Sequence, residues 1–169
     1  MTKKLLLIVA IAFSWIAAPT AHALTVSAEG GLSSVSGSAY SGTESSGMNY
    51  GGALRMSVAP MIEAGAFYKK GTVDLNAGGS TGTQFYGLTV QGNLPALFFV
   101  EGRLGMHSFT ASDNAIGYGA GLGYNFLSAG VVKLSAVGAY QSAPYKASGS
   151  STTVSGTNFD INLRLTAGF

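Results

Sequence analysis

The stretch that decides the fold is Phe159-Asp-Ile-Asn-Leu-Arg-Leu-Thr-Ala-Gly-Phe169, the last eleven residues of the sequence. Every odd-numbered position is apolar, and every even-numbered position is polar, charged or glycine. Side chains alternate between two faces in a β-strand, so a period of two predicts a strand with one apolar and one polar face. The polar face carries Asp160, Asn162 and Arg164, and the apolar face ends in an aromatic ring.

The same alternation recurs upstream and predicts an all-β fold with eight strands in total. The further segments are residues 24–32, 48–58, 62–69, 86–94, 98–107, 116–126 and 132–141. Their lengths are close to the roughly 9–11 residues that cross a membrane as a tilted strand. Short connections at 59–60, 94–95 and 128–130 alternate with longer ones at 34–47, 70–83, 109–115 and 142–157. This regular alternation predicts an eight-stranded antiparallel up-and-down transmembrane β-barrel, with its short turns on the periplasmic side.

The amino terminus has the pattern of a secretory signal peptide. Lys3-Lys4 precedes an apolar stretch at 5–18, and Ala21-His22-Ala23 follows as a small-x-small cleavage site. The apolar stretch is shorter than the roughly 17–25 residues that a membrane-anchoring helix needs. We therefore expect cleavage between Ala23 and Leu24, which separates a signal peptide at 1–23 from a barrel domain at 24–169.

The composition fits an exported membrane protein better than a soluble domain. Charged residues make up 9% of the chain, far below the roughly 25% of soluble domains. The chain has nine basic and seven acidic residues, and the excess consists of the two lysines of the signal peptide. The mature chain is therefore formally neutral, so its charge does not favour nucleic-acid binding. The absence of cysteine means that no disulfide stabilises the fold.

The charged residues of the predicted strands share one face. They are Glu29, Arg55, Glu63, Glu101, Arg103, Lys133, Asp160 and Arg164, with Lys69 at the outer rim. The opposite face carries no charge within the predicted segments, which favours a membrane barrel with a charged lumen over a soluble barrel such as a lipocalin. Acids and bases balance, so we expect a salt-bridged plug, with a selective pore or a proton path as the alternative. Glycines at 117–123 are expected to leave room for Glu101 and Arg103.

Aromatic residues on the apolar face are sorted by depth along the strands. The predicted girdle residues are Tyr50, Tyr68, Tyr86, Tyr118 and Tyr140 at the outer ends, and Phe98 and Phe126 at the inner ends. Two aromatic rings that flank an aliphatic band are typical of proteins that sit in a bilayer.

The chain resembles the OmpA/OmpX-type small outer-membrane barrels in its eight strands, its signal peptide and its stretch GYGAGLGYNF at 117–126. The terminal Phe169, with Leu163 and Leu165, is similar to the signal that the barrel-assembly machinery reads. The resemblance implies an outer-membrane location, contacts with outer-membrane lipids and lipopolysaccharide, a monomeric state and no cofactor.

A structural or surface-interaction role, in adhesion or envelope integrity through the outer loops, is the function we expect. A narrow channel for ions or small solutes is the alternative, and a lipid-A-modifying enzyme is the less favoured one. His107 and Ser108 fall on opposite faces of one strand, unlike the His-x-Ser spacing of the lipid A deacylases, so we expect no catalytic residues. With one histidine in the mature chain and no cysteine, a transition-metal site is not expected.

Overall fold

The structure is a computed structural model that describes residues 23–36, 45–74, 80–110, 112–147, 151 and 153–169. Residues 1–22 of the predicted signal peptide lie outside the described residues, so only Ala23 of that segment is placed. No helix in the described ranges is long and apolar enough to span a membrane.

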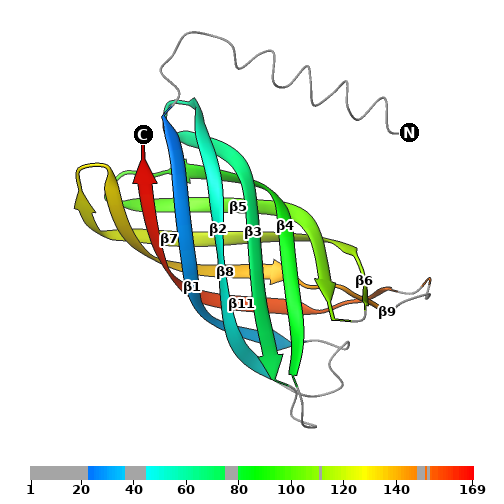
Figure 1. The fold of residues 1–169 in the computed structure, drawn as a ribbon. Helices are drawn as coiled ribbons and strands as arrows, with labels where there is room; N and C mark the ends of the chain where they lie inside the picture. The colour runs from blue at the N-terminus through cyan, green and yellow to red at the C-terminus, as the bar shows by residue number, and fades with distance from the viewer. Residues whose placement is uncertain (1–22, 37–44, 75–79, 111, 148–150, 152) are drawn as a thin grey trace, which may run out of the picture.

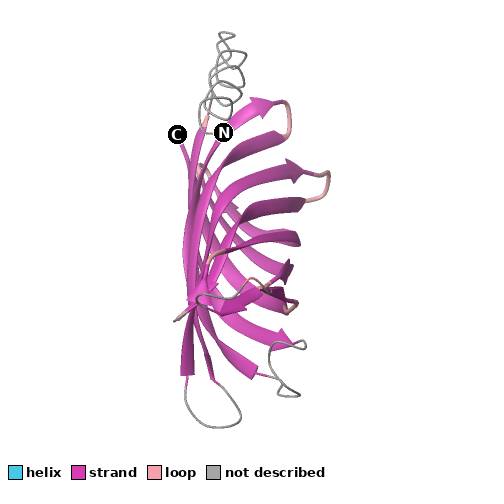
Figure 2. Cartoon of the chain, turned by 90° about the vertical axis from the view of Figure 1, so that its right-hand side faces the viewer, coloured by secondary structure: helices cyan, strands magenta, loops and turns pink. Residues whose placement is uncertain are grey.

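Eight long strands form a closed antiparallel barrel (Figure 1). They are β1 (Leu24–Ser36), β2 (Ser45–Ala59), β3 (Ile62–Asp74), β4 (Ser80–Asn93), β5 (Phe98–Phe109), β7 (Ala115–Ala129), β8 (Val132–Ser142) and β11 (Thr157–Gly168). Each strand pairs with its neighbours in the chain, and β1 pairs with β11 to close the ring. The strands are tilted and lie side by side around the wall (Figure 2). The predicted fold class, an all-β eight-stranded antiparallel barrel, is confirmed.

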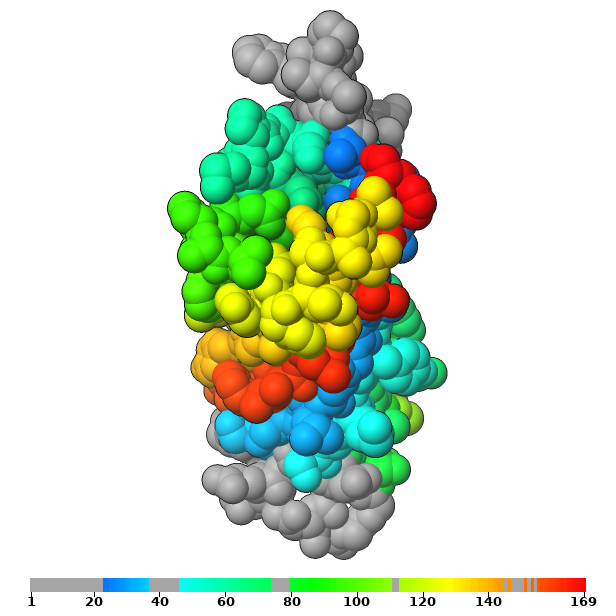
Figure 3. Space-filling model, turned by 90° about the vertical axis from the view of Figure 1, so that its left-hand side faces the viewer, coloured from blue at the N-terminus to red at the C-terminus, as the bar shows by residue number. Residues whose placement is uncertain are grey.

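Both ends of the barrel-forming chain meet at one end of the barrel, which we call the terminal end (Figure 1). Leu24 and Phe169 exchange two backbone hydrogen bonds there, at 3.0 and 2.8 Å. The space-filling view in Figure 3 shows β1 lying against β11 along this wall, and β8 lies on the other side of β11. Closure thus joins the first and last strands without any covalent link.

The connections at the terminal end are tight, as the sequence predicts. Only residues 60–61, 94–97 and 130–131 separate the strands there. Met61, Ala96 and Leu97 adopt positive φ angles of 64°, 61° and 70°. The left-handed region costs a residue with a Cβ about 1–2 kcal/mol, so the barrel holds these turns against a local preference.

A second, small sheet lies at the opposite end, which we call the distal end (Figure 1). It consists of β6 (Ser112–Asp113), β9 (Tyr145–Ala147) and β10 (Thr153–Val154) in the order β10-β9-β6. Asp113 lies opposite Lys146 in this sheet. The sheet ties the connection between β5 and β7 to the one between β8 and β11.

The strands extend further toward the distal end than the sequence indicated, so the expected long connections at 34–47, 70–83, 109–115 and 142–157 are wrong at their edges. Strand β1 continues to Ser36, and β3 continues to Asp74. Pairing persists because buried apolar residues line the inside at this level. They are Val35, Val73, Phe109 and Ala143, which we call the apolar cluster. A hydroxyl–hydroxyl bond of 3.0 Å between Ser36 and Thr157 adds to the pairing.

Glycines on β7 make room for neighbouring side chains. Gly121 and Gly119 lie opposite Glu101 and Arg103, but a Cβ on Gly119 would meet Gln141 at 2.8 Å rather than Arg103. The tightest approach is at Gly123, where a Cβ would lie 2.0 Å from Cζ of Phe99. Gly119 and Gly121 thus lie opposite Arg103 and Glu101 as expected, and the closest large side chain that a glycine of β7 admits is the Phe99 ring.

Replacing Gly123 by alanine should lower the free energy of unfolding by about 1–3 kcal/mol, because the new methyl group has to displace the buried Phe99 ring. Urea unfolding of the purified barrel in lipid vesicles measures the change. Adding Phe99→Leu should cost less than the sum of the two single changes. Gly138→Ala is the control, because a Cβ there meets nothing within 4 Å. Strict additivity of the two changes would contradict the packing explanation.

Candidate functional site in the barrel lumen

The charged side chains of the long strands turn inward over most of the barrel. The buried ones are Glu29, Arg55, Lys69, Glu101, Arg103, Asp160 and Arg164. Glu63 is half-buried, with 13% of its side chain exposed. Lys70 is an outward, exposed charge on the distal part of β3, so the expectation of an uncharged outer face is wrong for this longer strand. The lumen is therefore the place where chemistry could concentrate.

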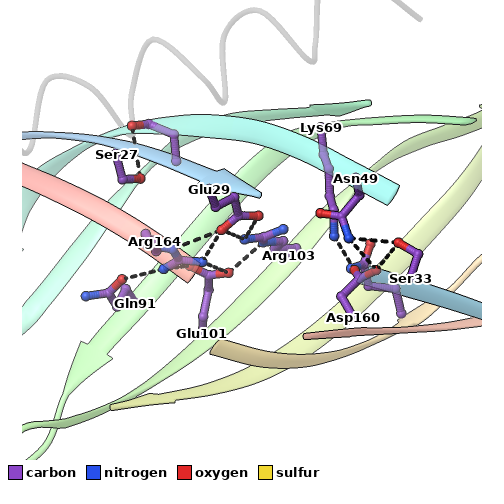
Figure 4. A network of polar contacts seen from close by, with 12 residues as sticks. Ser27, Glu29, Ser33, Asn49, Lys69, Gln91, Glu101, Arg103, Asp160 and Arg164 are labelled. Carbon is purple, nitrogen blue, oxygen red and sulfur yellow. Dashed lines mark hydrogen bonds and ion pairs between the residues drawn. The ribbon is translucent and has the colours of Figure 1, made fainter. Parts of the chain in front are cut away.

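Arg164 lies at the centre of the largest group of ion pairs (Figure 4). Its Nη2 is 2.6 Å from Oε2 of Glu29, and its Nη1 is 2.8 Å from Oε2 of Glu101. Glu29 lies directly opposite Arg164 across the β1–β11 seam. One guanidinium thus joins β1, β11 and β5, and each of its three nitrogens donates a hydrogen bond.

Two further arginines complete this group. Arg103 donates to both carboxylates, with 2.8 Å to Glu29 and 2.5 Å to Glu101. Arg55 lies 3.3 Å from Glu101 and 3.5 Å from Glu63. We call these residues the six-residue charge cluster; they are Glu29, Arg55, Glu63, Glu101, Arg103 and Arg164. Its formal charges cancel, which fits the rule that buried charges need partners.

Lys69 and Asp160 form a second, separate ion pair closer to the distal end (Figure 4). Asp160 is completely buried, and it also accepts hydrogen bonds from Ser33 at 2.5 Å, from Asn49 at 3.3 Å and from Gln141. The expectation that Lys69 sits at the outer rim is wrong, because β3 continues past it to Asp74 and places it inside.

Lys133 stands apart from both groups. It is exposed at the terminal end of β8, and no ion pair joins it to any residue that the structure describes. Four acids are therefore balanced by four bases, as predicted, but the fourth base is Lys69 instead of Lys133. Lys69 pairs with Asp160, and Lys133 is left as the unpaired base.

Aromatic rings separate the layers of the lumen, and alternation alone did not assign them a role. Phe99 lies beneath Arg164, with 5.3 Å from the guanidinium carbon to the ring centroid. Phe67 lies 5.2 Å from the guanidinium carbon of Arg103 and packs edge-on against Phe85 at 4.8 Å. The alternation does place these rings on the inner face. An aromatic and an arginine that both point inward were the signal from which these contacts could have been predicted.

His107 is buried in this aromatic layer. Its ring lies 5.7 Å from Phe85 and 4.8 Å from Phe109, measured between centroids. Ser108 follows on the other side of the strand and is half-buried. No group of three histidine or carboxylate side chains is placed to hold a metal ion within the described ranges.

The predicted girdle residues all point outward and are exposed. They are Tyr50, Tyr68, Tyr86, Tyr118, Tyr140, Phe98 and Phe126. Tyr68 lies directly opposite Tyr86 on the next strand, and Tyr140 lies opposite Phe159. At the terminal end Phe98 packs against Tyr124 at 4.9 Å. The aromatic residues thus form two groups at different depths.

The predicted assembly residues also lie on the outside of β11 and at its end. Leu163 and Leu165 are 60% and 53% exposed, and Phe169 is 76% exposed. Ala23 accepts a backbone hydrogen bond of 3.2 Å from Ser57, directly before the expected cleavage site at Leu24.

Replacing Arg164 by methionine should lower the free energy of unfolding by about 3–5 kcal/mol, because it leaves Glu29 and Glu101 short of a buried partner. Adding Glu29→Gln should cost less than the sum of the single changes. Lys133→Met removes the same charge from an unpaired, exposed position and should stay within about 0.5 kcal/mol of the wild type. Equal losses in the Arg164 and Lys133 variants would contradict this assignment.

The sequence matches no protein-family model and no curated protein. Among solved structures, the barrel is similar to Neisserial surface protein A (NspA), with a TM-score of 0.63 and 14% identity over 87% of this chain and 99% of that one. It is also similar to the outer membrane protein AlkL, with a TM-score of 0.51 and 9% identity over 88% of this chain and 90% of that one. At this identity the likeness concerns the fold. The chain has the OmpA/OmpX-type fold of small eight-stranded outer-membrane barrels, as its sequence indicated.

Proposed function

We propose that the chain is an integral outer-membrane barrel whose lumen is filled by its own side chains, and that it acts structurally or through surface contacts at its distal end. The observation that carries this proposal is the exposed apolar wall between the two aromatic groups. Its large members are Leu54, Leu88, Val90, Leu104, Leu122, Ile161, Leu163 and Leu165, each at least half exposed. Water disfavours so continuous an apolar surface, whereas lipid chains accept it.

A change of polarity along the strands indicates which part of the barrel lies within the membrane. Beyond the tyrosines, the outward residues of β1, β3 and β4 become polar, as at Ser36, Lys70, Thr72 and Gln84. At the same level the inward residues become apolar, in the apolar cluster. This part of the barrel has the pattern of a β-structure in water, so we place it outside the bilayer, and the terminal end with its short turns on the periplasmic side.

The filling of the lumen favours a structural role over the channel alternative. The two ion-pair groups and the aromatic rings between them occupy the middle of the barrel, and the apolar cluster closes the distal end. An eight-stranded barrel is just wide enough for side chains to fill. An ion crossing it would have to displace paired, buried charges. The burial of His107 among aromatic rings, with Ser108 on the other face, also supports a non-enzymatic function.

The remaining expectations belong to the same proposal. Residues 1–23 would act as a cleaved signal peptide, and the mature barrel would be a monomer in contact with outer-membrane lipids and lipopolysaccharide. Adhesion or envelope integrity would depend on the distal connections. The two similar structures are those of a surface protein and an outer membrane protein, which agrees with this location.

The protein should be recovered in outer-membrane fractions and should migrate differently on SDS gels with and without boiling, because a closed barrel resists SDS until heated. In planar bilayers it should show no large, steady conductance, with a general porin as the positive control. Recovery in the soluble periplasmic fraction would refute the membrane location, and a stable open pore would favour the channel.

Deleting Phe169 should lower the amount of folded outer-membrane protein several-fold, because it removes two hydrogen bonds to Leu24 and the last outward aromatic ring. Deleting the exposed Ser151 of a distal connection is the control and should leave the amount unchanged. Immunoblots of unboiled and boiled membrane fractions measure the folded share. Equal yields of the two variants would contradict a role for Phe169 in assembly.

A further inference from the structure

The terminal end of the lumen contains a cavity of about 340 Å³, which we call the chamber. Its floor includes Phe99 and Arg164, and its mouth includes Gly130, Val131 and Phe169. Val131 and Phe169 are 62% and 76% exposed, so the chamber opens at the terminal end. Its volume lies in the range of about 300–1,000 Å³ that small-molecule sites occupy.

Two side chains of opposite charge face each other across the chamber. Glu63 is the second residue of β3, and Lys133 is the second residue of β8; each follows a tight turn at the terminal end. In the strand order of the closed barrel, β3 and β8 are four strands apart in either direction. The two residues therefore lie on diametrically opposite walls at the same end, and both line the chamber.

Each of these charges has binding capacity left. Lys133 is the unpaired base described above, and its ammonium group has three donors. Glu63 is the least buried carboxylate of the six-residue charge cluster, and its 3.5 Å contact with Arg55 is the longest ion pair there. Its Oε1 accepts a single hydrogen bond of 3.3 Å, from Asn93. A carboxylate oxygen accepts more than one hydrogen bond, so Glu63 can still receive a cationic donor.

Neutral polar groups line the walls between the two charges. On one side Gln91 donates to Asn93 at 2.9 Å. On the other, Ser135 donates to Oδ1 of Asn125 at 2.7 Å, which leaves the amide nitrogen of Asn125 as a donor for a ligand. Such a wall can give a polar ligand further hydrogen bonds, as from the amide nitrogen of Asn125.

We propose that the chamber binds a small zwitterion of the amino acid or dipeptide class. Glu63 receives its ammonium group, Lys133 receives its carboxylate, and the amides of the walls contact the atoms between. A simple anion would pair with Lys133 alone, and a simple cation with Glu63 alone, so the site discriminates by requiring both charges in one molecule. This ligand goes beyond the proposed structural role, and its binding is testable whether or not the distal end contacts a host surface.

The test is a titration of the isotope-labelled barrel in detergent micelles, followed by NMR of the backbone amides. The probes are diglycine, which carries both charges, N-acetylglycine, which is an anion, and glycinamide, which is a cation. We expect saturable shifts with diglycine, confined to residues that line the chamber, such as Gln91, Asn93 and Asn125. The two singly charged probes should bind at least tenfold more weakly.

Two variants assign the contacts. Lys133→Met should weaken diglycine binding at least tenfold, whereas Lys70→Met, which removes the same charge from the outer wall, should leave it unchanged. Glu63→Gln should also weaken it, and if that variant does not fold, the comparison of N-acetylglycine, which lacks the ammonium group, with diglycine on the wild type tests the same contact. Heat-dependent migration on SDS gels verifies that each variant is folded.

The proposal is overturned if no probe gives saturable shifts in the chamber, if N-acetylglycine binds as tightly as diglycine, or if Lys133→Met binds diglycine like the wild type. None of these results would affect the proposed membrane location, which fractionation tests separately.

Discussion

The barrel depends on one guanidinium group, that of Arg164, placed between the carboxylates of Glu29 and Glu101. A buried charge without a partner is very unfavourable, so each of these groups needs the others. The partners come from the first, fifth and last long strands, and Glu29 lies 135 residues from Arg164 in the chain. The charges are therefore satisfied only when β1 has paired with β11. In this way the ion pairs make closure of the barrel a cooperative event rather than the sum of independent hairpins.

The proposed placement of the barrel in a membrane accounts for the reversal of polarity near the tyrosines. Between the aromatic groups the wall is apolar outside and charged inside, as at Leu88 and Arg103. Beyond them the order is reversed, with Thr72 outside and Val73 inside. A strand keeps its period of two throughout, so in the proposed placement the outward positions change from apolar to polar, and the inward ones from polar to apolar, where lipid gives way to water. The apolar cluster also keeps water away from the neighbouring pair of Lys69 and Asp160, and so strengthens its attraction.

Alternation sufficed to predict the strand number, the direction of the side chains and the short connections, because the period of two is a property of the local chain. It located Glu29 opposite Arg164, since both were a similar distance from the terminal end. It did not locate Lys69, because residues 70–74, which read as the start of a loop, continue β3 and move the rim outward. It also counted Lys133 among the paired charges of the lumen, whereas no ion pair joins Lys133 to a described residue. Which inward charges meet depends on shear and on side-chain length, and neither can be read from spacing along one strand.

The two ends of the lumen differ because different side chains fill them. At the distal end four buried apolar residues meet in the apolar cluster. At the terminal end, Gly130 and Gly168 take up little of the space, and the chamber remains. Phe99 and Arg164 both line the floor of the chamber, and the Phe99 ring fits there because position 123 on the next strand is glycine. A single pairing of a large residue with the smallest one thus shapes the floor at which a recess open to solvent meets Arg164, the centre of the ion pairs that hold the barrel together.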